Sequence, residues 1–458
     1  MSDRIFCASR DCHAGRSIAI VAWCIVALCT GAADAQDLSI TTATMYDQNV
    51  LDIYTPSPDR VTEFGLGLSN DWDFDQSSIN MSYDGSLRFF RDFPEKSYHY
   101  HALSLTSNYR FEHEIDDDED STDEQSGSEP MDSAQKASAA AARAAIAAAG
   151  QDSLEQTLYG SLIAASQFDR SENSTFDNSI FGGSISFRQP FGPTVGVRPT
   201  YTLTYHEYPN LSGITNFQND VGVLIGLNVM PDSWVGILPL YSVKTYPTKG
   251  SVSYTIATRV LIPPQGHGRG ATWRDTTISG NVAYTVPSVS QFAYSAYWVQ
   301  KFSPNFAAAL QYTYFAKPNG LARVLPDVLR NGVHGQGTAV DFASQDDIVD
   351  DRFSYRAHHF ALSVNSKLPL SLALSFNGSY DSKFYTYAAK DLDEVTVLAN
   401  QRRDRRIDLI VSMSRRWHIT ESSSLKPQIE YRYLNNQSNA PYYNFDKNLF
   451  LAGIEFNF

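Results

Sequence analysis

The sequence predicts an all-β protein, an antiparallel transmembrane β-barrel of 16 or 18 strands. Runs of about ten residues alternate between apolar and polar side chains and are separated by turn residues, as in outer-membrane barrels. Tyr and Phe, which favour strands, occur 26 times each. Beyond residue 35 no apolar run reaches the roughly 20 residues that a transmembrane helix needs. A chain of this kind that enters a membrane must cross it with strands.

The first 35 residues have the features of a secretory signal peptide. Three arginines precede an apolar stretch from Ser17 to Cys29, and Ala33 and Ala35 fit the cleavage rule. A membrane anchor is the alternative, but this stretch is short for a span of roughly 20 residues. All four cysteines lie in this segment, so the barrel expected over 36–458 can form neither a disulfide nor a thiolate metal site.

The alternation is clearest in four runs, at 195–206, 221–229, 277–286 and 370–379. In the first, Tyr201 and Leu203 share one face, whereas Thr200 and Thr202 share the other. A soluble β-sandwich also alternates, but it places long charged side chains outside. Here the polar face carries mainly Ser, Thr, Asn and Gly, which favours the lumen of a barrel.

About eighteen such runs can be counted, of which those at 38–46, 153–165 and 254–261 are the weakest. Pro199, Pro239 and Pro427 lie inside runs, and each is expected to mark a bulge or a strand end. The connections alternate in length. Those at 366–369, 303–305, 231–233 and 189–193 are short, and those at 316–352, 383–403 and 435–447 are long. We therefore expect the long connections on the extracellular side.

An acidic segment interrupts the pattern. Between Glu112 and Asp132 there are eleven carboxylates and no Lys or Arg, and an Ala-rich stretch with high helix propensity follows up to Gly150. We interpret 112–150 as a disordered acidic tether with a short helix, inserted between strands on the periplasmic side. A calcium site is the alternative, but the spacing of an EF-hand loop is absent.

No catalytic motif is recognisable. The sequence has no G-x-S-x-G elbow, no H-E-x-x-H and no phosphate-binding glycine loop, and we expect no enzyme, cofactor or metal. His99 and His101 share one strand face, and His358 and His359 are adjacent. Two imidazoles without a third ligand are more simply interpreted as polar strand residues.

A charged strand runs from Asn400 to Ile419 and is followed by further charged runs. Its inward face and the polar faces of other runs predict pore-lining charges at Arg198, Asp381, Arg406, Asp408, Arg416, Lys426, Glu430, Arg432 and Glu455. Two interpretations stay open. Such charges can pair across strands and brace the wall, or they can set the field of a pore.

Two further groups are expected to face outward. Arg403 and Arg405 precede the apolar part of their strand, at the level where lipopolysaccharide phosphates are natural partners of guanidinium groups. At the end of the sequence, Ile454, Phe456 and Phe458 lie on the apolar face of the last run and Glu455 on the polar face. We interpret these three as the lipid face of the closing strand and as a signal read by the barrel-assembly machinery.

The last 60 residues or so resemble a known family. The segments "RRDRRIDLIVSMSRRW" and "LKPQIEYRYLNNQSNAPYYNFDKNLFLAGIEFNF" are similar to the closing strands of the β-barrel porin type 2 group of outer-membrane proteins. "MYDQN" at 45–49 and "TFDNS" at 175–179 resemble strand entries of the same group. A similar barrel ends the surface lipoprotein assembly modifiers, whose tetratricopeptide repeats are not visible in this sequence.

These observations lead to one expected function and two alternatives. We expect a porin-like channel in the outer membrane of a Gram-negative bacterium, for small polar solutes or for polysaccharide export. The alternatives are a protein or lipoprotein export or assembly barrel, and a surface adhesin or structural barrel without an open pore, which would bind through 316–352. Expected partners are outer-membrane lipid, lipopolysaccharide, the barrel-assembly machinery and the transported solute, and no nucleic acid.

Overall fold

The computed structural model of the chain describes most of the predicted barrel. The described residues are 36–49, 56–111, 156–169, 177–209, 215–230, 232–247, 250–262, 272–284, 288–319, 352–390, 397–420 and 422–458. The predicted signal segment 1–35 and the predicted insertion 112–150 lie outside them, so both stay predictions. In this part of the chain, no helix is long and apolar enough to cross a membrane.

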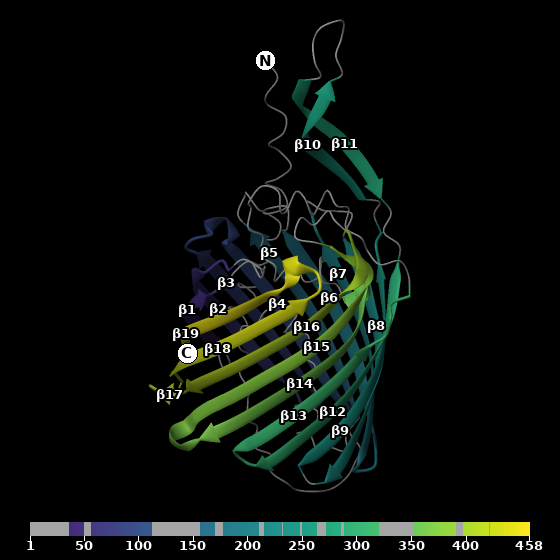
Figure 1. Cartoon of the computed structure of the whole chain (residues 1–458). Coiled ribbons are helices and arrows are strands. Elements are labelled where there is room, and N and C mark those ends of the chain that lie inside the picture. The colour runs from purple at the N-terminus through teal and green to yellow at the C-terminus, as the bar shows by residue number, and fades with distance from the viewer. Residues whose placement is uncertain are drawn as a thin grey trace, which may run out of the picture.

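One antiparallel sheet contains nearly all the described strands (Figure 1). Its strands are β1 (Gln36–Asp47), β2 (Asp59–Asp73), β3 (Ser77–Phe90), β4 (Tyr98–Phe111), β5 (Gln156–Asp169), β6 (Asn178–Phe191), β7 (Val195–Glu207), β8 (Asn216–Met230), β9 (Ser233–Thr245), β12 (Val289–Ser303), β13 (Phe306–Phe315), β14 (Tyr355–Leu368), β15 (Leu372–Lys390), β16 (Val397–Arg415), β17 (Trp417–His418), β18 (Ser424–Ser438) and β19 (Phe445–Asn457). Short 3-10 turns precede or join strands at η1 (Pro94–Lys96), η4 (Arg352–Ser354), η5 (Pro369–Ser371) and η6 (Pro441–Tyr443).

The sheet closes into a barrel of sixteen strands. β1 pairs with β2 on one side and with β19 on the other, from Ser39 opposite Asn457 to Asp47 opposite Leu449. Leu38 and Phe458 exchange two backbone hydrogen bonds of 2.9 and 3.3 Å at the end of this ladder. β17 has two residues and pairs beside the start of β18, so it continues β16 rather than adding a strand. Closure leaves no edge strand in the described barrel.

Two of the eighteen predicted runs do not belong to the barrel. β10 (Gly250–Ile262) and β11 (Thr272–Tyr284) pair with each other in a separate two-stranded sheet. Figure 1 shows this hairpin extending beyond one end of the barrel. Alternation of side chains marks a strand with two different faces, but it does not say which sheet that strand joins. The run at 277–286 was therefore correctly predicted as a strand and wrongly assigned to the barrel.

The outer face of the barrel is apolar. Each of the sixteen barrel strands carries at least one exposed large hydrophobic side chain. On β19 these are Phe450, Ile454 and Phe456, with Phe458 just beyond, whereas Glu455 between them points inward and is largely covered. An apolar band around a closed barrel is the structure that a bilayer stabilises. The fold is therefore that of a membrane-spanning barrel of the outer-membrane type.

The two edges of the barrel differ. We call turn rim the edge with the connections 74–76, 192–194, 231–232, 304–305 and 369–371, together with the strand ends Gln36 and Asn457. The opposite edge, the loop rim, has the longer connections and the β10–β11 hairpin. Because barrels of this type place short turns in the periplasm, the loop rim faces outward from the cell. β4 ends and β5 begins at the turn rim, so the predicted acidic insertion departs from there.

Two predicted long connections were overestimated. β15 continues to Lys390 and β16 begins at Val397, so strands occupy most of 383–403, and β18 likewise continues to Ser438. These strand ends extend past the apolar band, where neither face contacts the hydrocarbon interior of the bilayer. The alternation that predicts strands is lost there, because both faces carry polar side chains.

The three prolines are accommodated in different ways. In the β6–β7 ladder, Arg198 and Pro199 have no paired residue, and in the β8–β9 ladder Leu238 and Pro239 have none. The register is the same on both sides of each gap. Each proline still pairs with the strand on its other side. Pro427 lies one residue past the last β16–β18 pair. The expected bulges are absent at Pro199 and Pro239, because a missing N–H interrupts the ladder toward one neighbour only.

A packed apolar cluster covers the inner wall near the turn rim. The indole of Trp234 lies across Gly226 of β8 and Gly236 of β9, and Tyr297 and Val299 of β12 pack against it. A Cβ at Gly236 would lie 2.3 Å from Trp234 Cη2, and one at Gly226 would lie 2.6 Å from Trp234 Nε1. The two glycines therefore provide the space for the indole.

Replacing Gly236 with alanine is expected to lower the free energy of unfolding by about 1–3 kcal/mol, because the indole must move out of a packed position. Urea unfolding of the protein in lipid vesicles, followed by tryptophan fluorescence, measures this change. Gly196 is the matched control, because a Cβ there has no heavy atom within 4 Å. Equal effects of the two substitutions would contradict this role of Gly236.

Candidate functional site

Ion pairs join neighbouring strands on the inner wall formed by β14 to β19. The guanidinium of Arg432 on β18 donates to both carboxylate oxygens of Asp408 on β16, at 3.0 and 2.7 Å. Lys426 Nζ on β18 lies 3.3 Å from Glu455 Oε2 on β19. These four side chains are largely buried, so the pairs are screened less than surface pairs. Four of the predicted inward charges thus meet in two cross-strand pairs.

A third group lies on the same wall, farther toward the loop rim. His359 Nδ1 on β14 is 2.7 Å from Asp381 Oδ1 on β15, and Arg406 of β16 lies directly opposite Asp381 in the ladder. Glu430 is partly covered and shares its face with Ser412 opposite it. Arg416 is exposed in the break between β16 and β17 at the turn rim, apart from the other predicted charges.

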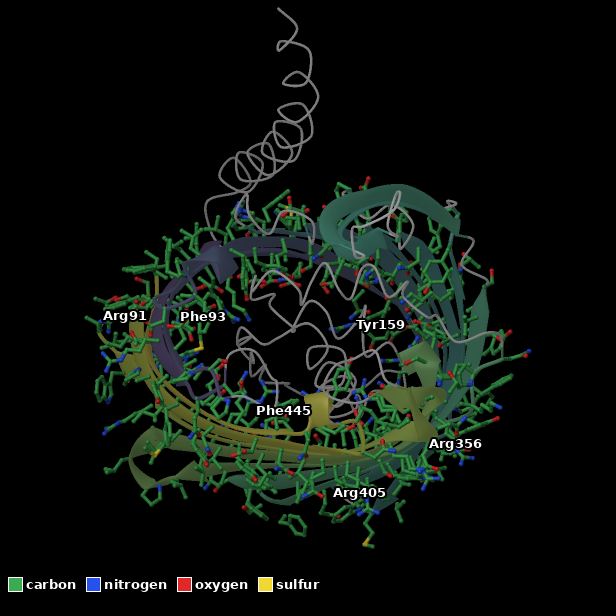
Figure 2. All side chains as sticks on the ribbon, turned by 45° about the horizontal axis from the view of Figure 1, so that its top comes forward. Arg91, Phe93, Tyr159, Arg356, Arg405 and Phe445 are labelled. Carbon is green, nitrogen blue, oxygen red and sulfur yellow. The ribbon has the colours of Figure 1, made fainter. Side chains whose placement is uncertain are left out.

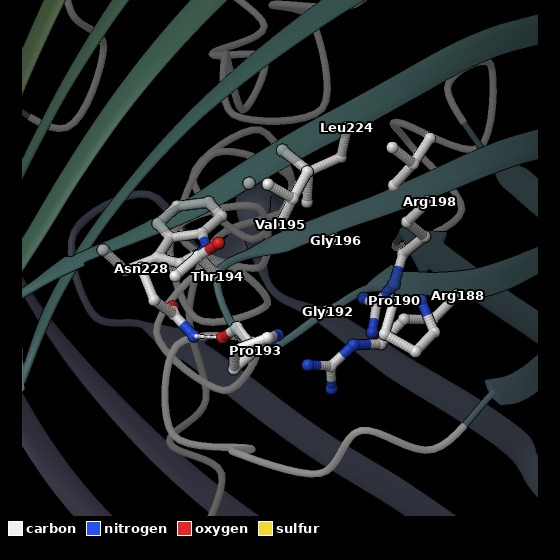
Figure 3. Close-up of a pocket in the computed structure, with 13 residues that line it drawn as sticks. Arg188, Pro190, Gly192, Pro193, Thr194, Val195, Gly196, Arg198, Leu224 and Asn228 are labelled. Carbon is white, nitrogen blue, oxygen red and sulfur yellow. Dashed lines mark hydrogen bonds between the residues drawn. The ribbon is translucent and has the colours of Figure 1, made fainter.

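The remaining predicted inward charge, Arg198, belongs to a pocket near the turn rim. Arg188 of β6 and Arg198 of β7 occupy opposite positions where the ladder omits its pairs. Arg198 Cζ lies 4.5 Å from the ring centroid of Tyr159 on β5. Figure 3 shows the two guanidinium groups close together at one side of the pocket. Like charges in opposite positions are unfavourable by themselves, and an anion between them would offset this cost.

The other side of the pocket is apolar. Its lining includes Leu224 and Trp234, with Thr194 and Asn228 as neutral polar groups (Figure 3). None of the described residues that line the pocket is acidic. Arg188 as a partner of Arg198 was not predicted from the sequence, because the two are ten positions apart and meet only through the β6–β7 register. The pocket can accept an anion beside an apolar surface.

The pocket and the ion pairs face one another across the barrel. β18 is the eighth strand from β7 in either direction round the ring of sixteen. Tyr159 points into the lumen in Figure 2, where the labelled Arg356 and Arg405 point away from it. One wall therefore carries charges that compensate each other, and the opposite wall carries two neighbouring cations.

A set of polar contacts holds η4 along the inner wall at the loop rim. Arg352 of η4 donates from Nη2 to Asp220 Oδ1 at 2.8 Å and to Ser242 Oγ at 3.0 Å. Asp220 is on β8, whereas η4 precedes β14. In the ring, three strands lie between β8 and β14, namely β9, β12 and β13. The Nε2 of Gln291 on β12 lies within 3.0 Å of the Arg352 and Tyr355 carbonyl oxygens, which anchors η4 to the wall.

Replacing Arg352 with alanine is expected to raise the conductance of an open barrel, because it releases η4 from β8 and removes a long side chain from the inner wall. Asp220→Asn should also raise the conductance, since it removes the charge that holds the Arg352 guanidinium. Single-channel current at fixed salt measures the effect. If the double variant differs from wild type by the sum of the two single effects, the two residues do not act as one bridge.

An aromatic cluster with one cation lies inside the loop rim. Arg402 Cζ is 4.2 Å from the Tyr385 ring centroid and 3.5 Å from that of Tyr443. Its Nε lies 3.0 and 3.1 Å from the two carboxylate oxygens of Asp404, and Ser438 Oγ donates to the same carboxylate at 2.6 Å. Strand parity indicates that Arg402 and Asp404 face inward, but not that Tyr443 covers them.

The predicted outer arginines do face outward. Arg403 and Arg405 on β16 are exposed, and Figure 2 shows Arg405 pointing away from the barrel. Among the described residues, no group of three or more His, Cys, Asp or Glu side chains is placed to hold a metal ion.

Comparisons with known proteins find a match in the last part of the chain. The family model for surface lipoprotein assembly modifiers matches residues 330–458. This segment has 129 residues (458 − 330 + 1), less than a third of the chain. It confirms the resemblance of the closing strands to that barrel family. No curated protein matches the chain.

Solved structures of proteins from Pseudomonas aeruginosa, among them the outer membrane protein OprD, are similar over most of the chain. OpdL is 11% identical, with 93% of this chain and 99% of that chain covered and a TM-score of 0.38. OprD is 9% identical, with 93% of each chain covered and a TM-score of 0.39. OccK2 (OpdF), solved in complex with glucuronate, is 10% identical, with 92% and 98% covered and a TM-score of 0.36.

Proposed function

We propose that this protein is an outer-membrane channel for small polar solutes. The observation that carries the proposal is a closed sixteen-stranded barrel with charged and hydroxyl side chains along its inner wall, from Arg402 at the loop rim to Lys426 near the turn rim. Barrels of this strand number are wide enough to hold an aqueous lumen.

We infer a preference for anions from the turn-rim pocket. Arg188 and Arg198 lie beside each other there, and none of the described residues that line it is acidic. The apolar side of the pocket suits the carbon skeleton of a small organic acid. The preferred solute is therefore a small carboxylate.

Liposome swelling tests this function. Vesicles containing the protein should swell in isotonic arabinose, and more slowly in a neutral trisaccharide, because the lumen selects by size. Gluconate should enter faster than a neutral sugar of similar size, with the counter-ion kept the same. Swelling no faster than in protein-free vesicles would show that the barrel is closed to solutes of this size.

A second function follows from the family match at 330–458. A barrel that takes part in exporting or assembling a lipoprotein would use the predicted acidic insertion, which departs from the turn rim, to engage its client. Deleting residues 112–150 distinguishes the two functions. The deletion should leave solute swelling intact in a simple channel, whereas it should abolish binding of the client in an export barrel.

A further inference from the structure

Three arginines form a patch on the outer face of β14, β15 and β16. Arg356, Phe384 and Arg403 lie directly opposite one another on these three strands, so one aromatic ring separates two guanidinium groups. Arg405 lies two residues along β16 from Arg403, opposite Ser382. All three arginines are exposed, and Figure 2 shows Arg356 and Arg405 on the outside of the barrel.

The ring of Phe384 holds the two flanking arginines in place. Arg356 Cζ is 5.1 Å and Arg403 Cζ is 5.7 Å from its centroid, on opposite sides along the ladder. Such stacking restricts long side chains while leaving their N–H groups free to donate. The Arg403 backbone N–H also donates to Asn439 Oδ1 at 2.7 Å. The guanidinium groups are thus ordered before any ligand binds.

The patch lies at the level where head groups begin. The row of outward residues that follows Arg405 toward the membrane is aromatic and apolar. It consists of Tyr312, Phe360, Tyr380 and Ile407, which lie in register on four strands. The row beyond it consists of Leu310, Leu362, Gly378 and Leu409. A row of aromatic rings above a row of aliphatic side chains marks the interface of the bilayer. The arginines follow this interface on the loop-rim side, so they face the outer leaflet.

The positive charge of the patch is not balanced by the described residues on its face. The acidic residues of the same strands, Asp381, Asp404 and Asp408, point inward and contact inward partners. The outward neighbours are Gln437 on β18 and Asn439 just beyond its end, and both are neutral. Two ordered guanidinium groups and a third beside them at head-group level favour anionic groups of matching geometry, and phosphates accept bidentate hydrogen bonds from guanidinium groups.

We propose that Arg356 and Arg403, ordered by Phe384, and the neighbouring Arg405 bind the phosphate groups of lipopolysaccharide in the outer leaflet. This glycolipid presents more than one phosphate on a rigid sugar backbone, which suits three guanidinium groups on adjacent strands. A phospholipid with one phosphate engages at most part of the patch. The site is independent of the channel, because it lies on the opposite face of the wall.

The test compares Arg356→Ala/Arg403→Ala with a control that removes the same charge. Arg110→Ala/Lys301→Ala is suitable, because both residues are exposed at the turn rim. Each protein, refolded in detergent, is titrated with lipopolysaccharide, phosphatidylglycerol or inorganic phosphate, and bound ligand is counted by native mass spectrometry. We expect lipopolysaccharide affinity to fall at least about tenfold in the first variant and to stay unchanged in the control.

A second variant, Arg356→Lys/Arg403→Lys, keeps the positive charge. It tests the site independently if the alanine variant fails to fold. It should lose part of the affinity, because an ammonium group lacks the fork geometry. Lipopolysaccharide binding that is equal in all variants would overturn the proposal. So would binding of phosphatidylglycerol or inorganic phosphate as tight as that of lipopolysaccharide, since either would mean that one phosphate suffices.

Discussion

Replacing Asp404 with alanine is expected to lower the free energy of unfolding by about 3–5 kcal/mol, because it removes the carboxylate that the buried Arg402 guanidinium binds. Both side chains are almost completely covered, with 4% and 2% of their surfaces exposed. The rings of Tyr385 and Tyr443 enclose the guanidinium, so water cannot replace the lost partner. Urea unfolding in lipid vesicles measures the change.

Asp446 on β19 is the matched control, because its side chain is exposed in the same part of the barrel. Asp446→Ala should change the free energy of unfolding by no more than about 0.5 kcal/mol. Replacing Arg402 with methionine together with Asp404→Leu should restore much of the loss, since it removes both charges. A small effect of Asp404→Ala alone would show that water reaches the guanidinium.

Arg188→Ala and Arg198→Ala are each expected to lower the anion-to-cation permeability ratio roughly two- to fivefold. A unit charge 4 Å away contributes about 1 kcal/mol in water, which corresponds to roughly fivefold in an equilibrium constant, and ions in solution screen part of this. The reversal potential of a bilayer with a salt gradient measures the ratio. Arg198→Glu should lower the anion-to-cation permeability ratio further than Arg198→Ala does.

A control removes two charges without changing the net charge. Lys426→Met together with Glu455→Leu takes away one cross-strand pair of the opposite wall, and the permeability ratio should stay as it is. An unchanged ratio in both arginine variants would mean that the turn-rim pocket lies outside the path of the ions. The channel could then still be open, but its selectivity would have another origin.

Strand parity is a reliable guide to the face of each residue. Asp408, Lys426, Arg432 and Glu455 share the covered face that parity gives them, because a strand alternates regardless of its neighbours. Arg403 and Arg405 lie on the exposed face for the same reason. Partners across strands are different, since they depend on register. Arg432 with Asp408, and Arg188 beside Arg198, follow only once the ladders are known.

Parity fails where both faces of a strand meet similar surroundings. The ends of β15, β16 and β18 beyond the apolar band were predicted as loops, since lipid no longer selects apolar residues on one face. The β10–β11 hairpin was counted in the barrel because a two-faced hairpin alternates like a barrel strand. Both errors come from the same limit. Alternation reports two different faces, and it does not report what those faces contact.

Some contacts of the loop rim have no signal in the sequence. Tyr443 covers Arg402 although 41 positions (443 − 402) separate them, and Arg352 reaches Asp220 over a separation of 132. These contacts form because η4 and η6 turn inward over the lumen. The roles of the pore-lining charges, of Arg403 and Arg405 toward lipid, and of Ile454, Phe456 and Phe458 in assembly stay predictions.

Single-channel recording in planar lipid bilayers tests the central claim that the barrel is an open channel. The purified protein should produce stepwise, ion-conducting openings, and Arg352→Ala should increase their size. If the whole chain is silent and only a variant lacking residues 112–150 conducts, the acidic insertion closes the channel or serves a client, as the second function requires. Bilayers that stay silent with both proteins would contradict the channel.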